Sequence, residues 1–166
     1  MREKFYKKVI FITARVHPGE SQSSFIAEAL INYLISDDPE ALEIRKKFVI
    51  KIIPMLNSDG VKLGNYRHGL LGVDLNRRWS KPSKFLHPEI YYVKSMIRFF
   101  NKKCKQPEVK SGGVVLVTDI HGHSKNMDVF MYSCLEDDPL HLHTHNTIIR
   151  AAPDAVDRTM PVFNTN

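Results

Sequence analysis

The sequence has few cysteines and no long hydrophobic run, and both absences narrow the class of protein. Cys104 and Cys134 are the only cysteines among 166 residues, too few for the disulfide framework of a small secreted domain. No apolar stretch approaches the ~20 residues that a membrane-spanning helix needs. The short apolar run near the N-terminus ends in Arg15 and His17, without the small residues of a signal-peptide cleavage site. We therefore expect a cytoplasmic protein with no membrane partner.

The sequence also lacks a dense basic block, an internal repeat, a linker and any low-complexity segment. Its net charge is +6, but no aromatic-rich basic motif of the kind found in nucleic-acid-binding domains is present. The positive net charge therefore indicates a solvated basic face or an acidic partner rather than a nucleic-acid partner. With 43% hydrophobic and 25% charged residues, the composition is that of a globular protein. The length predicts a single domain over residues 1–166.

Hydrophobic patterning predicts an α/β fold. Apolar runs typical of buried strands predict four strands: 7–14, 48–54, 114–120 and 128–134. Helical spacing predicts a helix from the N-cap candidates at 21–24 to a stop at 37–39, and two more at 40–47 and 88–104. Strands that alternate with helices indicate a mixed, largely parallel sheet flanked by helices. Residues 55–87 show little periodicity, and a connection of that length is typical of a functional loop.

Two of the expected strands lead into histidines. The first leads to His17 and the third to His121, and Glu20 follows His17 by about one helical turn. Ligands of open α/β sheets bind beyond the carboxyl ends of the strands, so we expect these three side chains to meet there. Two imidazoles and one carboxylate, with a fourth position left for water, form a recurrent catalytic zinc set.

The loop over 55–87 carries side chains that suit a metal-bound carbonyl and a free carboxylate. Arg67 offers a guanidinium that polarises such a carbonyl further. Asn76 and Arg77 are adjacent, and an amide beside a guanidinium fork suits a terminal carboxylate. Asp74 offers a carboxylate that accepts a hydrogen bond from the outer nitrogen of a ligand histidine. Solvated salt bridges within the loop are the alternative interpretation of all four residues.

Five short motifs resemble those of the M14 zinc carboxypeptidases, in the same order and spacing, over about residues 8–140. They read HPGES, PMLNSDGV, GNYR, GVDLNRRW and DIHGHS. Within that family the chain is most similar to the cytosolic carboxypeptidases, which trim glutamates from tubulin and other acidic tails. One departure is Ser58, which stands where the family usually has proline.

The resemblance implies one zinc ion, bound by His17, Glu20 and His121. It also implies that Asp74 orients His17 from the outer side of its ring. In this family a non-proline cis peptide often follows the third ligand, and here the resemblance places it between Gly122 and His123.

The same resemblance implies a metallocarboxypeptidase, a hydrolase that releases C-terminal residues, glutamate above all, by means of a zinc-activated water. Arg67 would stabilise the oxyanion of the scissile carbonyl, and Asn76 with Arg77 would hold the terminal carboxylate. The implied substrates are acidic protein or peptide tails, such as those of tubulin. The implied process is protein deglutamylation.

The general base of this mechanism is the main departure from the family. The family's glutamate lies far downstream of the third ligand, and Glu136 is the only glutamate after His121. Its setting, CLEDDP, is typical of a solvated turn. The sequence therefore predicts a truncated catalytic domain, incomplete at the C-terminal side of its sheet, that hydrolyses peptides slowly or not at all alone.

Two other functions stay open. Without the base, the chain would be a non-catalytic zinc-containing module that binds acidic tails. A related branch of the superfamily deacylates N-acyl amino acids with a similar metal set, although the full NSDGV and GNYR motifs favour a peptidase. The HLHTH stretch, with His141, His143 and His145, indicates either a second metal site or a polar surface.

Overall fold

A computed structural model describes residues 4–104, 109–123 and 130 of the chain. Its backbone forms two compact units, Met1–Gly122 and His123–Asn166, and the helices and strands below belong to the first. In the second unit, the rings of His123 and Phe130 meet edge to face with centroids 5.2 Å apart.

Three features expected from the sequence fall outside the described residues: most of the strand at 128–134, Glu136 and the HLHTH stretch. The single domain over residues 1–166 therefore stays a prediction.

Three parallel strands form the main sheet of the first unit, in the order β3-β2-β5. They are β2 (Lys8–Ala14), β3 (Phe48–Ile53) and β5 (Val114–Ile120). The strands predicted from the first three apolar runs are thus confirmed to within one residue at each end. Because the central strand β2 is parallel to both neighbours, the carboxyl ends of all three strands lie at the same edge of the sheet.

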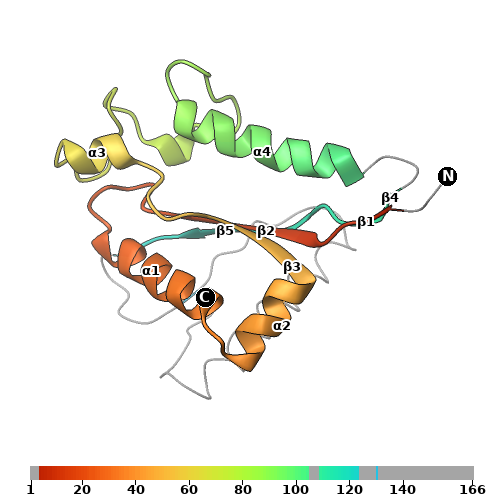
Figure 1. The fold of residues 1–166 in the computed structure, drawn as a ribbon. Helices are drawn as coiled ribbons and strands as arrows, with labels where there is room; N and C mark the ends of the chain where they lie inside the picture. The colour runs from red at the N-terminus through yellow and green to blue at the C-terminus, as the bar shows by residue number, and fades with distance from the viewer. Residues whose placement is uncertain (1–3, 105–108, 124–129, 131–166) are drawn as a thin grey trace. The chain divides into compact units, whose positions relative to one another are not determined.

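Helices lie on both faces of this sheet (Figure 1). The helices α1 (Ser21–Ile35) and α2 (Pro39–Lys47) cover one face, and α4 (Pro88–Cys104) covers the other. Asp38 caps α2, because its side chain accepts hydrogen bonds from the first N–H groups of that helix. The predicted α/β fold with a parallel sheet flanked by helices is confirmed. Within the described residues, no helix combines the length and the apolar character needed to cross a membrane.

A small pair of strands was not expected. The strand β1 (Lys4–Phe5) pairs in parallel with β4 (Val109–Ser111). Both strands are too short to show an alternating or continuous apolar pattern, so only their pairing reveals them.

The segment over 55–87 is less irregular than expected. It contains the helix α3 (Ser58–Lys62) and the 3-10 turn η1 (Leu75–Arg77). Each begins at a polar side chain that accepts a backbone N–H two or three residues further on, Asn57 for α3 and Asp74 for η1. These elements are held by their caps rather than by an apolar face, which is why hydrophobic spacing missed them.

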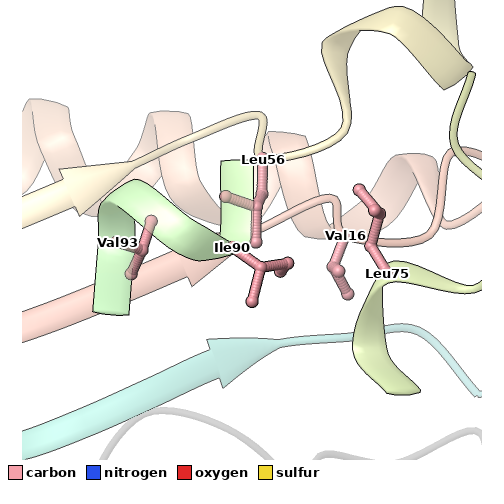
Figure 2. Close-up of a cluster of buried hydrophobic side chains, with 5 residues drawn as sticks. All are labelled: Val16, Leu56, Leu75, Ile90 and Val93. Atoms are coloured by element: carbon pink, nitrogen blue, oxygen red, sulfur yellow. The ribbon is translucent and has the colours of Figure 1, made fainter. Parts of the chain in front are cut away.

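A buried hydrophobic cluster joins the ends of the strands to the segment over 55–87 (Figure 2). Its members follow β2 and β3 or belong to η1 and α4: Val16, Leu56, Leu75, Ile90 and Val93. The fully buried Asn57 adds a polar link, since its side chain donates to the carbonyl of Val16 at 3.0 Å. The residues next to His17 and Asn76 are therefore anchored in one core.

Candidate metal centre

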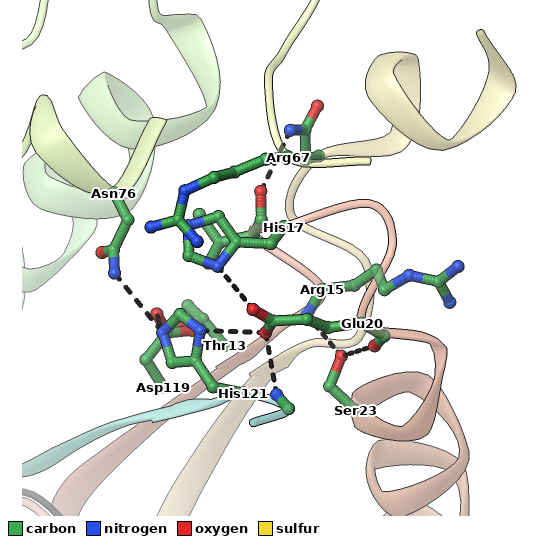
Figure 3. Close-up of polar contacts among 12 residues, drawn as sticks. Thr13, Arg15, His17, Glu20, Ser23, Arg67, Asn76, Asp119 and His121 are labelled. Atoms are coloured by element: carbon green, nitrogen blue, oxygen red, sulfur yellow. Dashed lines mark hydrogen bonds and ion pairs between the residues drawn. The ribbon is translucent and has the colours of Figure 1, made fainter. Parts of the chain in front are cut away.

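Three potential ligands of a metal ion converge at the carboxyl edge of the sheet (Figure 3). His17 lies beyond β2, Glu20 directly precedes α1, and His121 follows β5. Glu20 Oε1 lies 2.8 Å from His17 Nδ1, and Glu20 Oε2 lies 3.1 Å from His121 Nδ1. One ligand atom from each residue lies within 4.8 Å of the other two. The structure thus brings together the three residues that the sequence predicts as zinc ligands.

The donor set fits a zinc ion. Zinc binds imidazole nitrogen and carboxylate oxygen at about 2.0–2.2 Å in tetrahedral geometry, which sets neighbouring ligand atoms roughly 3.3–3.6 Å apart. The observed separations of 2.8 and 3.1 Å are shorter than this by roughly 0.2–0.8 Å. Small side-chain rotations would therefore open the space that the ion needs.

The turn between β2 and α1 is fastened by side chains. Arg15 adopts a left-handed backbone conformation, with φ of 59°, which is uncommon for a residue with a side chain. Its N–H donates to Ser23 Oγ at 3.1 Å, and Ser23 Oγ donates to the carbonyl of Glu20 at 2.7 Å. The Arg15 guanidinium also donates to the carbonyl of Pro18 and to Ser24. These bonds fix the turn on which two of the candidate ligands lie.

Gly19 lets the GNYR segment approach this turn. Its N–H donates to the carbonyl of Tyr66 at 2.6 Å. A Cβ at this position would lie 2.5 Å from the Tyr66 ring and 2.8 Å from the Tyr66 carbonyl oxygen. The glycine of HPGES therefore lets Tyr66, and with it Arg67, lie next to the candidate ligands.

The start of α1 differs from the expectation that a serine within 21–24 would cap it. The helix begins at Ser21, and Glu20 occupies the cap position without a side-chain bond to the helix. The carboxylate of Glu20 instead faces the two histidines and accepts the N–H of Gly122 at 2.8 Å. The acid that precedes the helix thus serves the site and not the helix end.

Asp74 connects His17 to Arg67. Its Oδ1 lies 3.1 Å from His17 Nε2 and accepts the N–H of Asn76 at 2.8 Å, while its Oδ2 accepts from Arg67 Nε at 2.9 Å. Burial raises the pKa of Asp74, but the Asn76 N–H, His17 and Arg67 together outweigh it, so this pKa lies below its usual value. An ionised carboxylate only accepts hydrogen bonds. A proton on His17 Nε2 satisfies this carboxylate, and with a metal bound beside Glu20 it leaves Nδ1 as the ligand atom.

The sequence reasoning did not identify the acidic neighbour of His121. Asp119 Oδ2 lies 2.7 Å from His121 Nε2. This contact raises the pKa of His121, whereas burial lowers it and Glu20 adds to the rise. The available signal was the spacing in DIH, because residues two apart at the end of a strand lie on the same face.

The two predicted substrate-binding residues differ in their contacts and in their exposure. Asn76 Nδ2 lies 3.4 Å from His121 Nε2, and Asn76 Oδ1 accepts from Trp79 Nε1 at 2.8 Å. Indole nitrogen is a donor only, so the Asn76 oxygen faces Trp79 and its NH₂ group faces the metal site. Arg77 is exposed on the same turn.

The prediction of a cis peptide bond between Gly122 and His123 is wrong. The described residues contain no cis peptide bond. For a non-proline residue the trans form is about 2.5–4 kcal/mol more stable.

Known proteins are similar to this sequence over most of its length. The family model for zinc carboxypeptidases, peptidase family M14, matches residues 2–159. Cytosolic carboxypeptidase 6 of Caenorhabditis elegans is 48% identical over 76% of this chain and 26% of that protein. Cytosolic carboxypeptidase 1 of Mus musculus is 39% identical over 92% of this chain and 12% of that protein. The chain thus spans about a quarter or less of the length of these relatives.

A solved structure shares the fold. The metallo-carboxypeptidase from Burkholderia cenocepacia matches with a TM-score of 0.79 at 28% identity, over 97% of this chain and 40% of that one. The fold, the donor set and the family match agree on zinc as the metal of this centre. The chain belongs to the zinc carboxypeptidase family, and its relatives there are the cytosolic carboxypeptidases.

Proposed function

We propose that the protein is a zinc-dependent metallocarboxypeptidase that releases C-terminal residues from acidic protein tails. The observation that carries this proposal is the group of His17, Glu20 and His121, in which both imidazole Nδ1 atoms face one carboxylate. Family membership supports the same reaction. Since the chain spans only part of its relatives, the activity, substrates and partners of the whole protein belong to the proposal.

The candidate zinc ligands and Arg67 would act at the scissile carbonyl. Bound zinc lowers the pKa of its water and polarises a carbonyl oxygen, and His17, Glu20 and His121 would hold it. Arg67 donates to Asp74 through Nε, and among the described residues its terminal amino groups have no acceptor. With its side chain 41% exposed, this guanidinium is available to stabilise the developing oxyanion.

Asn76 and Arg77 would bind the C-terminal end of the substrate. The contact with Trp79 turns the NH₂ group of Asn76 toward the centre, where it can donate to a terminal carboxylate. Arg77 follows on the same turn with an exposed guanidinium, and a guanidinium binds a carboxylate with two parallel hydrogen bonds. Together they select a free carboxyl terminus over a peptide interior.

The substrate class follows from charge and relatedness. The net charge of +6 attracts acidic chains, and the relatives at 37–48% identity are named cytosolic carboxypeptidases. We infer glutamate as the released residue, tubulin-like tails as substrates and the cytoplasm as the location. The process would then be protein deglutamylation.

Proton transfer needs a further group. A general base takes a proton from the water and returns it to the leaving amine. Glu136, the only glutamate after His121, lies outside the described residues. We therefore expect the 166-residue chain to bind zinc firmly and to turn over substrate slowly.

Peptide hydrolysis tests the proposal. The zinc-loaded chain is incubated with a peptide that ends in several glutamates, and released glutamate is measured by mass spectrometry. We expect slow release that stops after chelation, and none from the same peptide with a C-terminal amide. Arg67→Gln should lower the rate by roughly 10²–10³-fold, as loss of one oxyanion donor does.

Other outcomes favour other functions. Binding of the acidic peptide without cleavage would favour a non-catalytic module, and release from N-acyl amino acids alone would favour a deacylase. Brisk release would contradict the expected lack of a base. A chain that neither binds zinc nor cleaves any substrate would overturn the proposal.

A further inference from the structure

A short polar chain on two neighbouring strands lies behind His121. In the register of the sheet, Thr13 of β2 is the partner of Asp119 of β5. Thr13 is 1% exposed, and its hydroxyl donates to Asp119 Oδ1 at 2.7 Å. The parallel ladder of the two strands therefore fixes one oxygen of this carboxylate.

The other oxygen of Asp119 has His121 as its neighbour. Asp119 Oδ2 is buried and makes no hydrogen bond of standard geometry within the described residues, but it lies 2.7 Å from His121 Nε2. A buried carboxylate oxygen without a donor is costly. A proton on Nε2 of His121 removes that cost, and it leaves the lone pair on Nδ1, the atom that faces Glu20. The amide nitrogen of Asn76 also lies near Nε2, but at 3.4 Å it is farther away than the carboxylate at 2.7 Å, so the carboxylate decides the tautomer.

The two histidines of the centre are thus supported in the same way from different elements. His17 Nε2 faces Asp74 at 3.1 Å, in a turn of the segment over 55–87. His121 Nε2 faces Asp119 at 2.7 Å, within the sheet. A carboxylate behind each imidazole fixes its tautomer and its ring orientation toward a metal.

We propose that Asp119 is the positioning residue of His121, and that Thr13 holds Asp119 in place for this role. The inference rests on the proposed zinc function and extends it to residues that touch neither metal nor substrate. Its consequence is that zinc affinity depends on the hydroxyl of Thr13, on the central strand of the sheet. Loss of an outer carboxylate of this kind lowers metal affinity by roughly 10–100-fold.

The variant Asp119→Asn tests the proposal in the full chain. The hydroxyl of Thr13 donates to Asp119 Oδ1 at 2.7 Å, much closer than its other acceptor, the carbonyl of Thr118 at 3.5 Å. If this donation is kept, the amide oxygen of the new side chain faces Thr13 and its NH₂ group faces His121. Nε2 would then have to accept, which moves the proton to Nδ1, where it blocks the metal. We expect zinc to bind about 10–100-fold more weakly in competition with a chromophoric chelator.

A double variant separates positioning from a general loss of structure. In Thr13→Val with Asp119→Asn, the amide is free to present its oxygen to His121, so zinc affinity should recover part of the loss. Asp37→Asn removes an exposed carboxylate and should leave zinc affinity unchanged. Circular dichroism and thermal unfolding of the metal-free forms check that each variant folds.

The outcomes are distinguishable. If the parent chain binds zinc and Asp119→Asn binds it equally well, the positioning role is overturned while the proposed function stands. If the parent chain does not bind zinc, the proposed function fails instead. Should Asp119→Asn not fold, long-range ¹H–¹⁵N spectra of the parent decide: a proton on Nε2 of His121 supports the proposal, and a proton on Nδ1 overturns it.

Discussion

The carboxyl edge of the sheet and the segment over 55–87 both contribute to the metal centre, but they hold their side chains differently. At the sheet edge, two of the three candidate ligands, His17 and His121, follow strands whose register is fixed by a parallel ladder. In the segment over 55–87, Arg67 is held by a bond to Asp74, and Asn76 by a bond from Trp79 and a longer contact with His121. We therefore expect changes at the sheet edge to affect the metal, and changes at Arg67 or Asn76 to affect the substrate.

The largest effect is expected at the sheet edge. His121→Ala removes one of three ligands, so zinc affinity should fall by more than the roughly 10–100-fold that loss of an outer partner costs. Isothermal titration with zinc measures this directly. His68→Ala, which removes an exposed histidine of the segment over 55–87, is the matched control. If the two variants bound zinc equally well, the expected difference between the two regions would be wrong.

The core beneath both regions gives the next effect. Leu75 is 2% exposed in the buried cluster, so Leu75→Ala should lower the free energy of unfolding by about 2–5 kcal/mol through lost contacts and a cavity. Urea denaturation measures the change. Leu70→Ala, at a side chain that is 61% exposed, should stay within about 0.5 kcal/mol of the parent. A small effect at Leu75 would show that the cluster does not anchor the segment.

Gly19 tests the contact between the two regions. In Gly19→Ala, the new methyl group would meet both the ring and the carbonyl oxygen of Tyr66, and we expect a loss of about 1–3 kcal/mol in unfolding free energy. Adding Tyr66→Ala relieves the ring contact but leaves the carbonyl contact, so only part of the loss should return. Full recovery, or no loss at all, would contradict the close approach of the two segments.

The smallest effect is expected at Trp79. Trp79→Phe keeps an aromatic ring against the core but removes the donor that orients Asn76. The cost of one such hydrogen bond, about 0.5–1.5 kcal/mol, corresponds to roughly two- to tenfold weaker binding of a peptide with a free carboxyl terminus. Zinc affinity and binding of the amidated peptide should not change. A drop in zinc affinity would show that Asn76 also supports the metal.

The sheet and its helices could be predicted from the sequence because burial imposes a pattern. The strand β2 reads as a continuous apolar run, and the helix α4 as apolar residues at helical spacing, and both have the predicted bounds to within one residue. The short elements α3 and η1 could not be predicted in this way. Their geometry depends on the capping side chains of Asn57 and Asp74, and single polar residues of that kind are common in loops.

The candidate site was predictable in part for the same reason. Histidines at the ends of parallel strands have few directions in which to point, so His17 and His121 could be paired before the fold was known. The partner of His121 was missed because Asp119 lies inside an apolar strand, where an acid has no obvious role until the register brings Thr13 opposite. Spacing along the chain indicates which residues share a face, whereas only the register shows what lies across from them.

The central claim is that two imidazoles and one carboxylate of this chain hold a single zinc ion. X-ray absorption at the zinc edge, combined with a measurement of zinc per chain, tests it most directly. We expect one zinc per chain with only nitrogen and oxygen ligands, at about 2.0–2.2 Å, and loss of the metal in His17→Ala. A chain that retains no zinc, or one that binds it through sulfur at about 2.3 Å, would contradict the claim.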